Sequence, residues 1–289
     1  MKKRIIFDVI IVGGGLAGLT SAIHLSKREK RVLLIEKNEY PKHKVCGEYI
    51  SNEVLPYLNS LGIDPISEGA KKITKVHIST IKSNLIKGEL PLGGFGMSRY
   101  FLDNLLVKKA RLNGVQILKD TVDSINFKKE SFTIITKNSG VFQSKITIGA
   151  FGKRSSLDQK MNREFIKKKS PYLAIKTHVK GLFPQNLVAL HNFKGGYCGV
   201  SKVENNAINV CYITEYRSFK KHKNITDFQE QVVFKNEHLK KIFKESTPVF
   251  EKPLTISQVS FQTKNPIENH IIMCGDTAGM IHPLCGNGM

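Results

Sequence analysis

Tryptophan is absent from the 289-residue sequence, cysteine is scarce, and no long uninterrupted hydrophobic run occurs. Without about 20 consecutive apolar residues, no segment suits a membrane-spanning helix. The cysteines are odd in number and form no C-x-x-C pair; they are Cys46, Cys198, Cys211, Cys274 and Cys285. This pattern predicts neither a disulfide framework nor a zinc site, and it favours a reducing, cytoplasmic setting.

Acidic residues are in short supply, with 24 against 45 basic residues, which gives a formal net charge of +21. Such a balance raises nucleic acid as a partner, but the lysines are scattered and no helix-turn-helix, zinc-finger or RNA-binding signature accompanies them. We therefore expect no nucleic-acid partner, while peripheral contact with a membrane stays open. The nine histidines show no HExxH or paired ligand spacing, so we expect no metal site.

The first 36 residues have the pattern of a β-α-β unit. Residues 7–12 form a short apolar run typical of a strand buried on both faces, and residues 16–27 have helical apolar spacing. Residues 31–35 resemble a second buried strand, which closes with Glu36.

Glycines connect this first strand to the helix. Gly13, Gly15 and Gly18 fit the pattern G-x-G-x-x-G, which allows a tight turn, close approach of a pyrophosphate and close helix–strand contact. Glu36, at the end of the next strand, can accept hydrogen bonds from a ribose diol. The pattern predicts a dinucleotide site at the helix N-terminus, but it does not separate FAD from NAD.

The remaining sequence alternates between helical and strand patterns. Helices are predicted at 51–61, 100–112 and, as one element, about 227–243. Strands are predicted at 73–90 with a turn near 83–84, at 132–136, at 146–150, repeatedly over 173–214, and at 271–274.

The segment 274–288, CGDTAGMIHPLCGNG, resembles the second FAD motif of the para-hydroxybenzoate hydroxylase-like superfamily of FAD-dependent oxidoreductases. The resemblance spans nearly the whole chain. It implies that Asp276, after Gly275, binds the ribityl chain, and that the stretch from Pro283 through Gly286 and Gly288 passes beside the isoalloxazine ring. Glycines would bring backbone N–H groups close to a ring that becomes anionic when it is reduced.

The resemblance implies an α/β fold: a Rossmann-like FAD-binding domain with an inserted antiparallel-sheet substrate domain. We predict that residues 1–70, 96–158 and 262–289 form the FAD-binding domain. Residues 71–95 and 159–261 would form the substrate domain. The active site is expected where the two meet.

Two further segments resemble the superfamily. Residues 98–103 are similar to its arginine-containing helix start, which implies that Arg99 reaches the cofactor; an exposed arginine at a helix N-terminus is the alternative. Lys44-Val45-Cys46-Gly47-Glu48 resembles the Lys-x-Cys-Gly stretch of geranylgeranyl reductase-like members, which lies near the flavin. A purely structural role for Cys46 is equally compatible with the sequence.

The strand pair around Tyr197 and Cys211 also resembles the reductase-like branch, with Tyr197 either a pocket wall or part of the sheet architecture. No catalytic residue is assigned by the resemblance. The candidates near the flavin are Cys46, Tyr197 and Pro283.

Two features depart from the superfamily. Residues 148–155 align with the hydroxylases' middle motif, whose Asp-Gly pair assists cofactor and NAD(P)H binding, but Phe151 occupies the aspartate position. This weakens the case for hydroxylase-style use of NAD(P)H, which stays open as electron donor. The sequence also ends at Met289, inside the last flavin motif, so a C-terminally truncated enzyme is expected.

The leading prediction is an FAD-dependent oxidoreductase that reduces a double bond in a hydrophobic small molecule, isoprenoid, aromatic or carrier-bound. One alternative is an FAD-dependent monooxygenase that hydroxylates an aromatic or polyketide-type substrate. Another is a truncated, catalytically impaired flavoprotein fragment. A flavin halogenase is disfavoured because those relatives have a tryptophan-containing motif.

Overall fold

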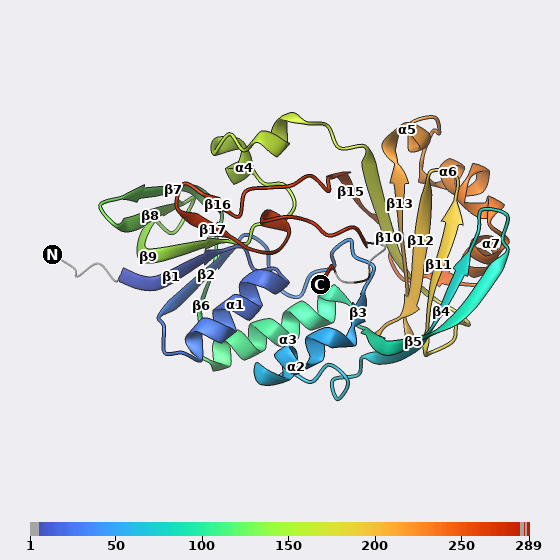
Figure 1. Cartoon of the computed structure of the whole chain (residues 1–289), viewed down its shortest axis with the longest axis horizontal. Helices are drawn as coiled ribbons and strands as arrows, with labels where there is room; N and C mark the ends of the chain where they lie inside the picture. Colours follow the sequence, from blue (N-terminus) through green and yellow to red (C-terminus); the bar gives the residue numbers. More distant parts are fainter. Residues whose placement is uncertain (1–5, 284–285, 287) are drawn as a thin grey trace.

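The computed structural model describes residues 6–283, 286, 288 and 289. Two β-sheets lie side by side in Figure 1, the sheet that contains the start of the chain at the left and the second sheet at the right. The C-terminal end of the chain lies between the two sheets. Among the helices of the described residues, none has the length and apolarity required to cross a bilayer.

The first sheet has a parallel centre, in the order β16-β17-β9-β1-β2-β6. Neighbouring strands from β17 to β6 run parallel, and β16 joins the edge antiparallel. A hairpin of β7 and β8 continues from β9. The strands are β1 (Ile6–Val12), β2 (Val32–Glu36), β6 (Gln116–Lys119), β7 (Val122–Lys128), β8 (Ser131–Thr136), β9 (Val141–Gly149), β16 (Ile267–Glu268) and β17 (Ile271–Met273).

Alternate residues of β1 are buried on opposite faces of this sheet. Val9 and Ile11 pack with a helical layer, whereas Ile10 and Val12 pack towards the β7–β8 hairpin. The helical layer contains α1 (Leu16–Ser26), α2 (Leu55–Ser60) and α3 (Arg99–Leu112). Burial on both faces explains why β1 and β2 are almost entirely apolar in sequence, apart from Asp8 and the terminal Glu36.

The second sheet has the order β14-β10-β13-β12-β11-β4-β5-β3, and β15 also pairs with β10. Its pairs are antiparallel except for β4 with β11, which run parallel. The strands are β3 (Tyr49–Ser51), β4 (Lys71–Ser79), β5 (Leu85–Gly96), β10 (Tyr172–Lys180), β11 (Leu187–Phe193), β12 (Gly196–Lys202), β13 (Ile208–Glu215), β14 (Thr247–Pro248) and β15 (Leu254–Val259).

The second sheet presents two chemically different faces. Ile175 and Val210 lie in an apolar core with the helices on the outer side of the sheet, which are α5 (Tyr216–Phe219), α6 (Ile225–Gln231) and α7 (Glu237–Lys244). Lys176 and Asn209, one position along each strand, hydrogen-bond to residues 44–48, which belong to the connection between β2 and β3. The alternation of a strand therefore turns polar side chains towards the first sheet.

The prediction of one helix over 227–243 is wrong, because α6, the 3₁₀ turn η4 (Val233–Lys235) and α7 are separate elements. The side chain of Asn236 accepts hydrogen bonds from the backbone N–H groups of His238 and Leu239, at 3.0 and 3.4 Å, and so caps α7. Its amide donates to Ser79 Oγ at 2.8 Å and to the Asn192 carbonyl at 3.0 Å. Tertiary contacts of one asparagine thus start a new helix inside a continuous apolar periodicity.

The segment predicted as a helix over 51–61 begins instead with the end of β3 and the turn η1 (Asn52–Val54), before α2. The other short elements are α4 (Ser156–Lys160), η2 (Glu164–Lys167), η3 (Glu204–Asn206) and η5 (Gly275–Thr277). The proposed division into two domains stays a prediction.

Candidate functional site

The chain from the end of β1 into the first turn of α1 requires glycine at positions 13 and 18. Gly13 has a φ of +107°, and a Cβ placed on it would lie 2.2 Å from the carbonyl oxygen of Ala150. A Cβ on Gly18 would lie 2.0 Å from the carbonyl oxygen of Gly13. These two glycines are therefore required by the fold itself, whatever the loop binds.

Gly15 differs from both, because its missing side chain leaves open space. The nearest heavy atom to a Cβ built there is Nη2 of Arg99, at 3.9 Å. Gly15 is the N-cap of α1, no side chain caps this helix, and its first turn contains no acidic residue. Backbone N–H groups, the positive end of the helix dipole and a guanidinium thus border the position where the G-x-G-x-x-G pattern predicts a pyrophosphate.

Glu36 is fixed at the end of β2 by the same turn. Its Oε2 accepts a hydrogen bond from the Gly14 N–H at 2.7 Å, and its Oε1 accepts one from the Asn38 N–H at 2.9 Å. Tyr40 donates its hydroxyl to the Gly14 carbonyl at 2.6 Å, and burial raises the pKa of this phenol. The carboxylate keeps acceptor capacity for a further donor such as a ribose hydroxyl.

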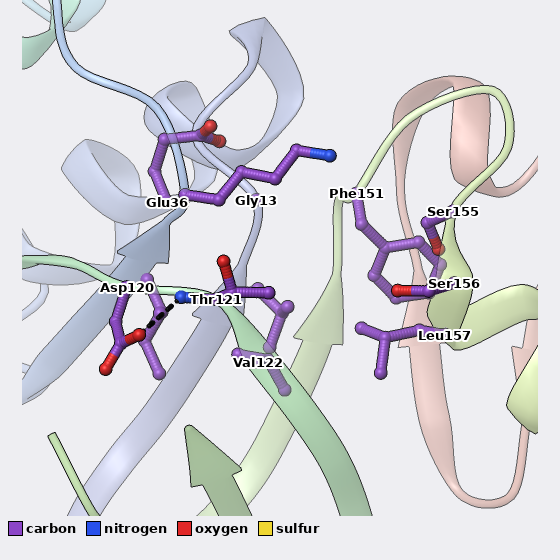
Figure 2. A pocket seen from close by; sticks show the side chains of 12 residues that line it. Gly13, Glu36, Asp120, Thr121, Val122, Phe151, Ser155, Ser156 and Leu157 are labelled. Atoms are coloured by element: carbon purple, nitrogen blue, oxygen red, sulfur yellow. Dashed lines mark hydrogen bonds between the residues drawn. The ribbon is translucent and has the colours of Figure 1, made fainter. Parts of the chain in front are cut away.

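A pocket opens beside Gly13 and Glu36 (Figure 2). One wall comes from the β6–β7 connection and the other from the segment that follows β9. The lining residues are Val12, Gly13, Ile35, Glu36, Lys37, Asp120, Thr121, Val122, Phe151, Ser155, Ser156 and Leu157. Phe151, which departs from the superfamily pattern in sequence, is therefore a wall of the same pocket as Glu36.

Arg99 begins α3 and is held by a buried carboxylate. Its Nε and Nη2 donate to the two oxygens of Asp103 at 2.7 and 2.9 Å, and Lys44 Nζ donates to Asp103 at 2.8 Å. Burial alone would lower the pKa of Arg99, but the charge and hydrogen bonds of Asp103 outweigh burial and raise it. The bidentate pair thus orients a permanent positive charge next to Gly15.

A second buried carboxylate, Glu48, joins the start of α3 to strand β10 of the second sheet. It is fully buried and accepts hydrogen bonds from Lys176 Nζ, from His178 Nε2 at 2.7 Å and from the Arg99 N–H at 2.7 Å. Burial by itself would raise the pKa of Glu48. The hydrogen bond from His178 and the charge of Lys176 outweigh burial and lower this pKa below its ordinary value, so the carboxylate stays ionised. Removal of the Glu48 charge would leave Lys176 as a buried cation without its carboxylate partner.

His43, in the connection between β2 and β3, packs on this cluster. Its ring stacks on Tyr100, with centroids 4.5 Å apart, and lies 4.6 Å from Phe250 and 5.2 Å from His178. Burial lowers the pKa of His43 to about 4, and the charges of Lys176 and His178 act in the same direction. The imidazole is therefore neutral at physiological pH.

The loop that contains Cys46 is docked onto the second sheet. The amide of Asn209 donates to the carbonyls of Gly47 and Cys46 at 2.7 and 3.3 Å, and Cys46 Sγ lies 3.4 Å from Met289 Sδ. Cys211 occupies the same face of the sheet as Asn209, and burial raises the pKa of its thiol to about 12. The sequence-predicted Cys46 segment and the Cys211 strand thus do meet.

The second motif starts with η5 and packs against the first. A Cβ on Gly275, whose φ is +60°, would lie 2.7 Å from Cβ of Ala17 in α1. Thr277 Oγ1 accepts a hydrogen bond from the Gly152 N–H at 2.8 Å. The two glycine motifs, about 260 residues apart in sequence, therefore pack against each other.

Two buried cationic side chains donate hydrogen bonds to backbone carbonyls of this turn. Lys264 Nζ donates to the carbonyl of Asp276 at 2.6 Å, and Arg163 Nη1 donates to the carbonyl of Thr277 at 3.0 Å and to Asp158 at 2.9 Å. Burial lowers the pKa of Lys264 to about 8. The carboxylate of Asp276 accepts no hydrogen bond from residues 6–283, 286, 288 or 289, so it is available to a ligand.

The remaining predicted residues occupy different surroundings. Gly286 lies at Tyr49, whose Cε1 would be 3.3 Å from an added Cβ, whereas Pro283 and Gly288 are exposed. Tyr197 lies on β12 opposite Ile213 of β13. The assignment of each residue to the cofactor or to the substrate stays a prediction.

Sequence reasoning missed the buried charges that hold these loops. They are Glu48, Asp103, Asp158, Arg163, Lys176, His178 and Lys264. One signal was present, because a lysine and a histidine interrupt the apolar run of β10, and charged residues are almost never fully buried without a partner. Nothing in the sequence pointed to Glu48 as that partner.

Comparison with known families gives a match over almost the whole chain. The family described as FAD binding domain matches residues 7–289. The open space at Gly15, the cationic and dipolar surroundings and the acceptor groups of Glu36 and Asp276 fit a dinucleotide of this kind. The predictions of the flavoprotein superfamily, of its α/β fold and of FAD as cofactor are confirmed.

Several characterised proteins are similar to this chain. Digeranylgeranylglycerophospholipid reductase of Methanococcus vannielii is 25% identical over 300 residues, which covers 98% of this chain and 73% of that protein. A 1H-pyrrole-2-carbonyl-(peptidyl-carrier protein) brominase of Pseudoalteromonas luteoviolacea is 28% identical over 186 residues, 61% of this chain and 45% of that protein. A solved flavin-dependent brominase superposes with a TM-score of 0.83 at 20% identity, covering 98% of this chain and 75% of that one.

Proposed function

Because the chain belongs to the FAD binding domain family, we propose that it forms the cofactor-binding and substrate-facing part of an oxidoreductase that reduces a double bond in a hydrophobic small molecule. The similarity to a reductase over 98% of the chain carries this proposal, because it includes both the cofactor motifs and the second sheet. The chain spans between 45% and 75% of the length of the proteins compared above.

Each part of the cofactor would be held by a different loop. The N-terminus of α1 at Gly15, with Arg99 beside it, would bind the pyrophosphate. Glu36 would accept hydrogen bonds from the adenosine ribose, and Asp276 from the ribityl hydroxyls. When bound, FAD supplies hydride-transfer or oxygen chemistry, and the chain contributes binding, orientation and exclusion of water.

The face of the second sheet turned towards these loops would form the substrate side. It carries Lys176, Asn209 and Cys211, and residues 44–48 are hydrogen-bonded across it. The cluster around Glu48 is fully buried, so it fixes the distance between the sheet and the cofactor loops and keeps water out of their junction. Reduction of a double bond consumes one hydride and one proton, and such a dry junction favours transfer over loss to solvent.

A second candidate is a flavin reaction that uses oxygen on an aromatic or carrier-bound substrate. The similarity to the pyrrole brominase favours it, because that relative's name specifies a carrier-bound pyrrole. NAD(P)H stays open as electron donor for either candidate. Phe151 in the aspartate position of the middle motif counts against the hydroxylase way of binding it.

One experiment separates the candidates. The purified chain would be loaded with FAD, reduced with dithionite without oxygen, and mixed either with a lipid that carries unsaturated isoprenoid chains or with buffer. The reductase proposal predicts reoxidation of the flavin, seen in its visible absorbance, together with a saturated lipid product in mass spectrometry. In a parallel mixture that contains oxygen and an aromatic or carrier-bound substrate, formation of a modified aromatic product without any saturated lipid product in the first mixture would instead favour the second candidate.

The matched control is Gly15→Val loaded and treated in the same way, because this variant should fold but not retain FAD. Substrate conversion by that variant would show that the reaction does not pass through the proposed site. Absence of FAD binding by the wild-type chain would contradict the proposal outright.

A further inference from the structure

The pocket of Figure 2 has an aromatic wall where the hydroxylase-like middle motif has an acidic residue. Phe151, Ser155, Ser156 and Leu157 stand on one side of the pocket, opposite residues 120–122. Phe151 is partly exposed, so its ring borders the pocket and is not simply part of the core.

The ring of Phe151 is held in a defined place. A Cβ added to Gly149 would lie 2.7 Å from Cε1 of Phe151 and 2.8 Å from Sδ of Met273, so only glycine at this position lets the ring lie there. The backbone of Phe151 also touches the first glycine motif, with its nitrogen 2.8 Å from a Cβ built on Gly13. The ring is therefore fixed relative to the loop that would bind the pyrophosphate.

The rest of the pocket is apolar inside and polar at the edge. Val12, Ile35, Val122 and Leu157 line it together with the ring. Asp120, although it borders the pocket, is satisfied by the backbone N–H groups of residues 121, 138 and 139 and by the Asn138 amide. These donors lower the pKa of Asp120 against the opposing effect of burial, so this carboxylate serves the local turn.

Two hydroxyls at the edge have no such role. Within the described part of the chain, neither the hydroxyl of Thr121 nor that of Ser156 makes a hydrogen bond. An apolar slot with a fixed aromatic wall and polar groups at its rim suits a flat heteroaromatic ring with polar edges. Glu36 at the same pocket places a ribose acceptor next to that ring.

We propose that Phe151 is a specificity-determining residue that contacts the adenine ring of FAD, so that the chain selects FAD over FMN through this pocket. The inference rests on the proposed cofactor site and adds a role for one residue of it. In the hydroxylases the Asp-Gly pair of this motif assists cofactor binding with a charged group, whereas the phenyl ring of Phe151 offers apolar contact without charge.

The test compares two flavins that differ in the adenosine half. Dissociation constants of FAD and FMN would be measured by flavin fluorescence for the wild type, Phe151→Ala, Phe151→Tyr and Phe151→Asp. We expect Phe151→Ala to weaken FAD binding by about tenfold, equivalent to ~1.4 kcal/mol, and to change FMN binding less than about twofold. Phe151→Tyr should keep the wild-type FAD affinity, and Phe151→Asp should lose at least as much as the alanine variant.

A second measurement guards against a folding defect, because the ring also packs on Met273. ADP, which carries the adenine and diphosphate but no flavin, should displace FAD from the wild-type chain and compete about tenfold less well in Phe151→Ala. Equal loss of FAD and FMN affinity, or unchanged FAD and ADP affinity in Phe151→Ala, would overturn the role of Phe151 and leave the cofactor site intact. A wild-type chain that binds no FAD would overturn both.

Discussion

Addition of a side chain at Gly15 separates cofactor binding from folding in this chain. A Cβ there meets ordinary van der Waals space, with Arg99 Nη2 at 3.9 Å, whereas a Cβ on Gly18 would lie 2.0 Å from a backbone oxygen. Gly15 has a φ of −81°, which any residue adopts. Gly15→Val should therefore fold, with a loss of about 1 kcal/mol or less because valine is a poor N-cap.

The same substitution should eliminate FAD retention. The valine methyl groups would extend from Gly15 into the space that the pyrophosphate needs at the N-terminus of α1, and they would separate it from the N–H groups. We expect the FAD dissociation constant to rise at least about 100-fold, equivalent to ~2.8 kcal/mol. Flavin absorbance after gel filtration measures retention, and urea unfolding measures stability.

Valine substitutions at two other glycines serve as controls. Gly88→Val adds the same side chain to β5, where the nearest atom is Cγ1 of Val76 at 3.5 Å, and should change neither quantity appreciably. Gly18→Val should fail to fold. Wild-type FAD occupancy in Gly15→Val would refute the assignment of the first glycine motif to the pyrophosphate.

Three further predictions concern buried charges and the second motif. Asp276→Ala should weaken FAD binding by about tenfold with little change in stability, since only a ligand hydrogen bond is lost; an unchanged dissociation constant would exclude the ribityl role. Glu48→Gln should lower the free energy of unfolding by ~3–5 kcal/mol, because Lys176 is left as an uncompensated buried charge. The double variant with Lys176→Met should recover part of this loss. No recovery would argue against the buried charge as the cause. Burial lowers the pKa of His191 to about 4. As the pH falls below about 6.5, this histidine therefore binds a proton in the unfolded chain before it does so in the folded chain. The free energy of unfolding should drop by up to ~3 kcal/mol between about pH 6.5 and pH 4. Urea unfolding at several pH values should show a smaller drop in His191→Gln, and parallel curves would contradict this origin.

The cofactor half of the fold follows closely from local sequence. The β-α-β unit needs an apolar strand, a glycine turn, an amphipathic helix and a second apolar strand, and these occur within 36 consecutive residues. Gly13 and Gly18 are legible because a positive φ and a close backbone approach exclude every other residue. Asn113 and Gly114 likewise end α3 where a stop signal is expected.

Helix boundaries in the second half depend on distant contacts. The periodicity over 227–243 is compatible with one helix, and it is Asn236, hydrogen-bonded to β4 and β11, that divides it. The amide of Asn236 finds its partners about 44 and 157 residues away in sequence. A local pattern contains no information about such partners.

The sequence alone determined that this protein has a Rossmann-like dinucleotide-binding unit, because phosphate binding by glycine turns is a property of short, contiguous segments. FAD followed from the resemblance of residues 274–288 to a second flavin motif, and the family match confirmed it. Only the tertiary structure decided which carboxylates pair with which cations. It showed that Glu48 joins Lys176 to the start of α3, and that Phe151 lines the same pocket as Glu36. The physical reason is that a buried charge or an aromatic wall acquires its role from the atoms that surround it, and those atoms come from segments that folding brings together.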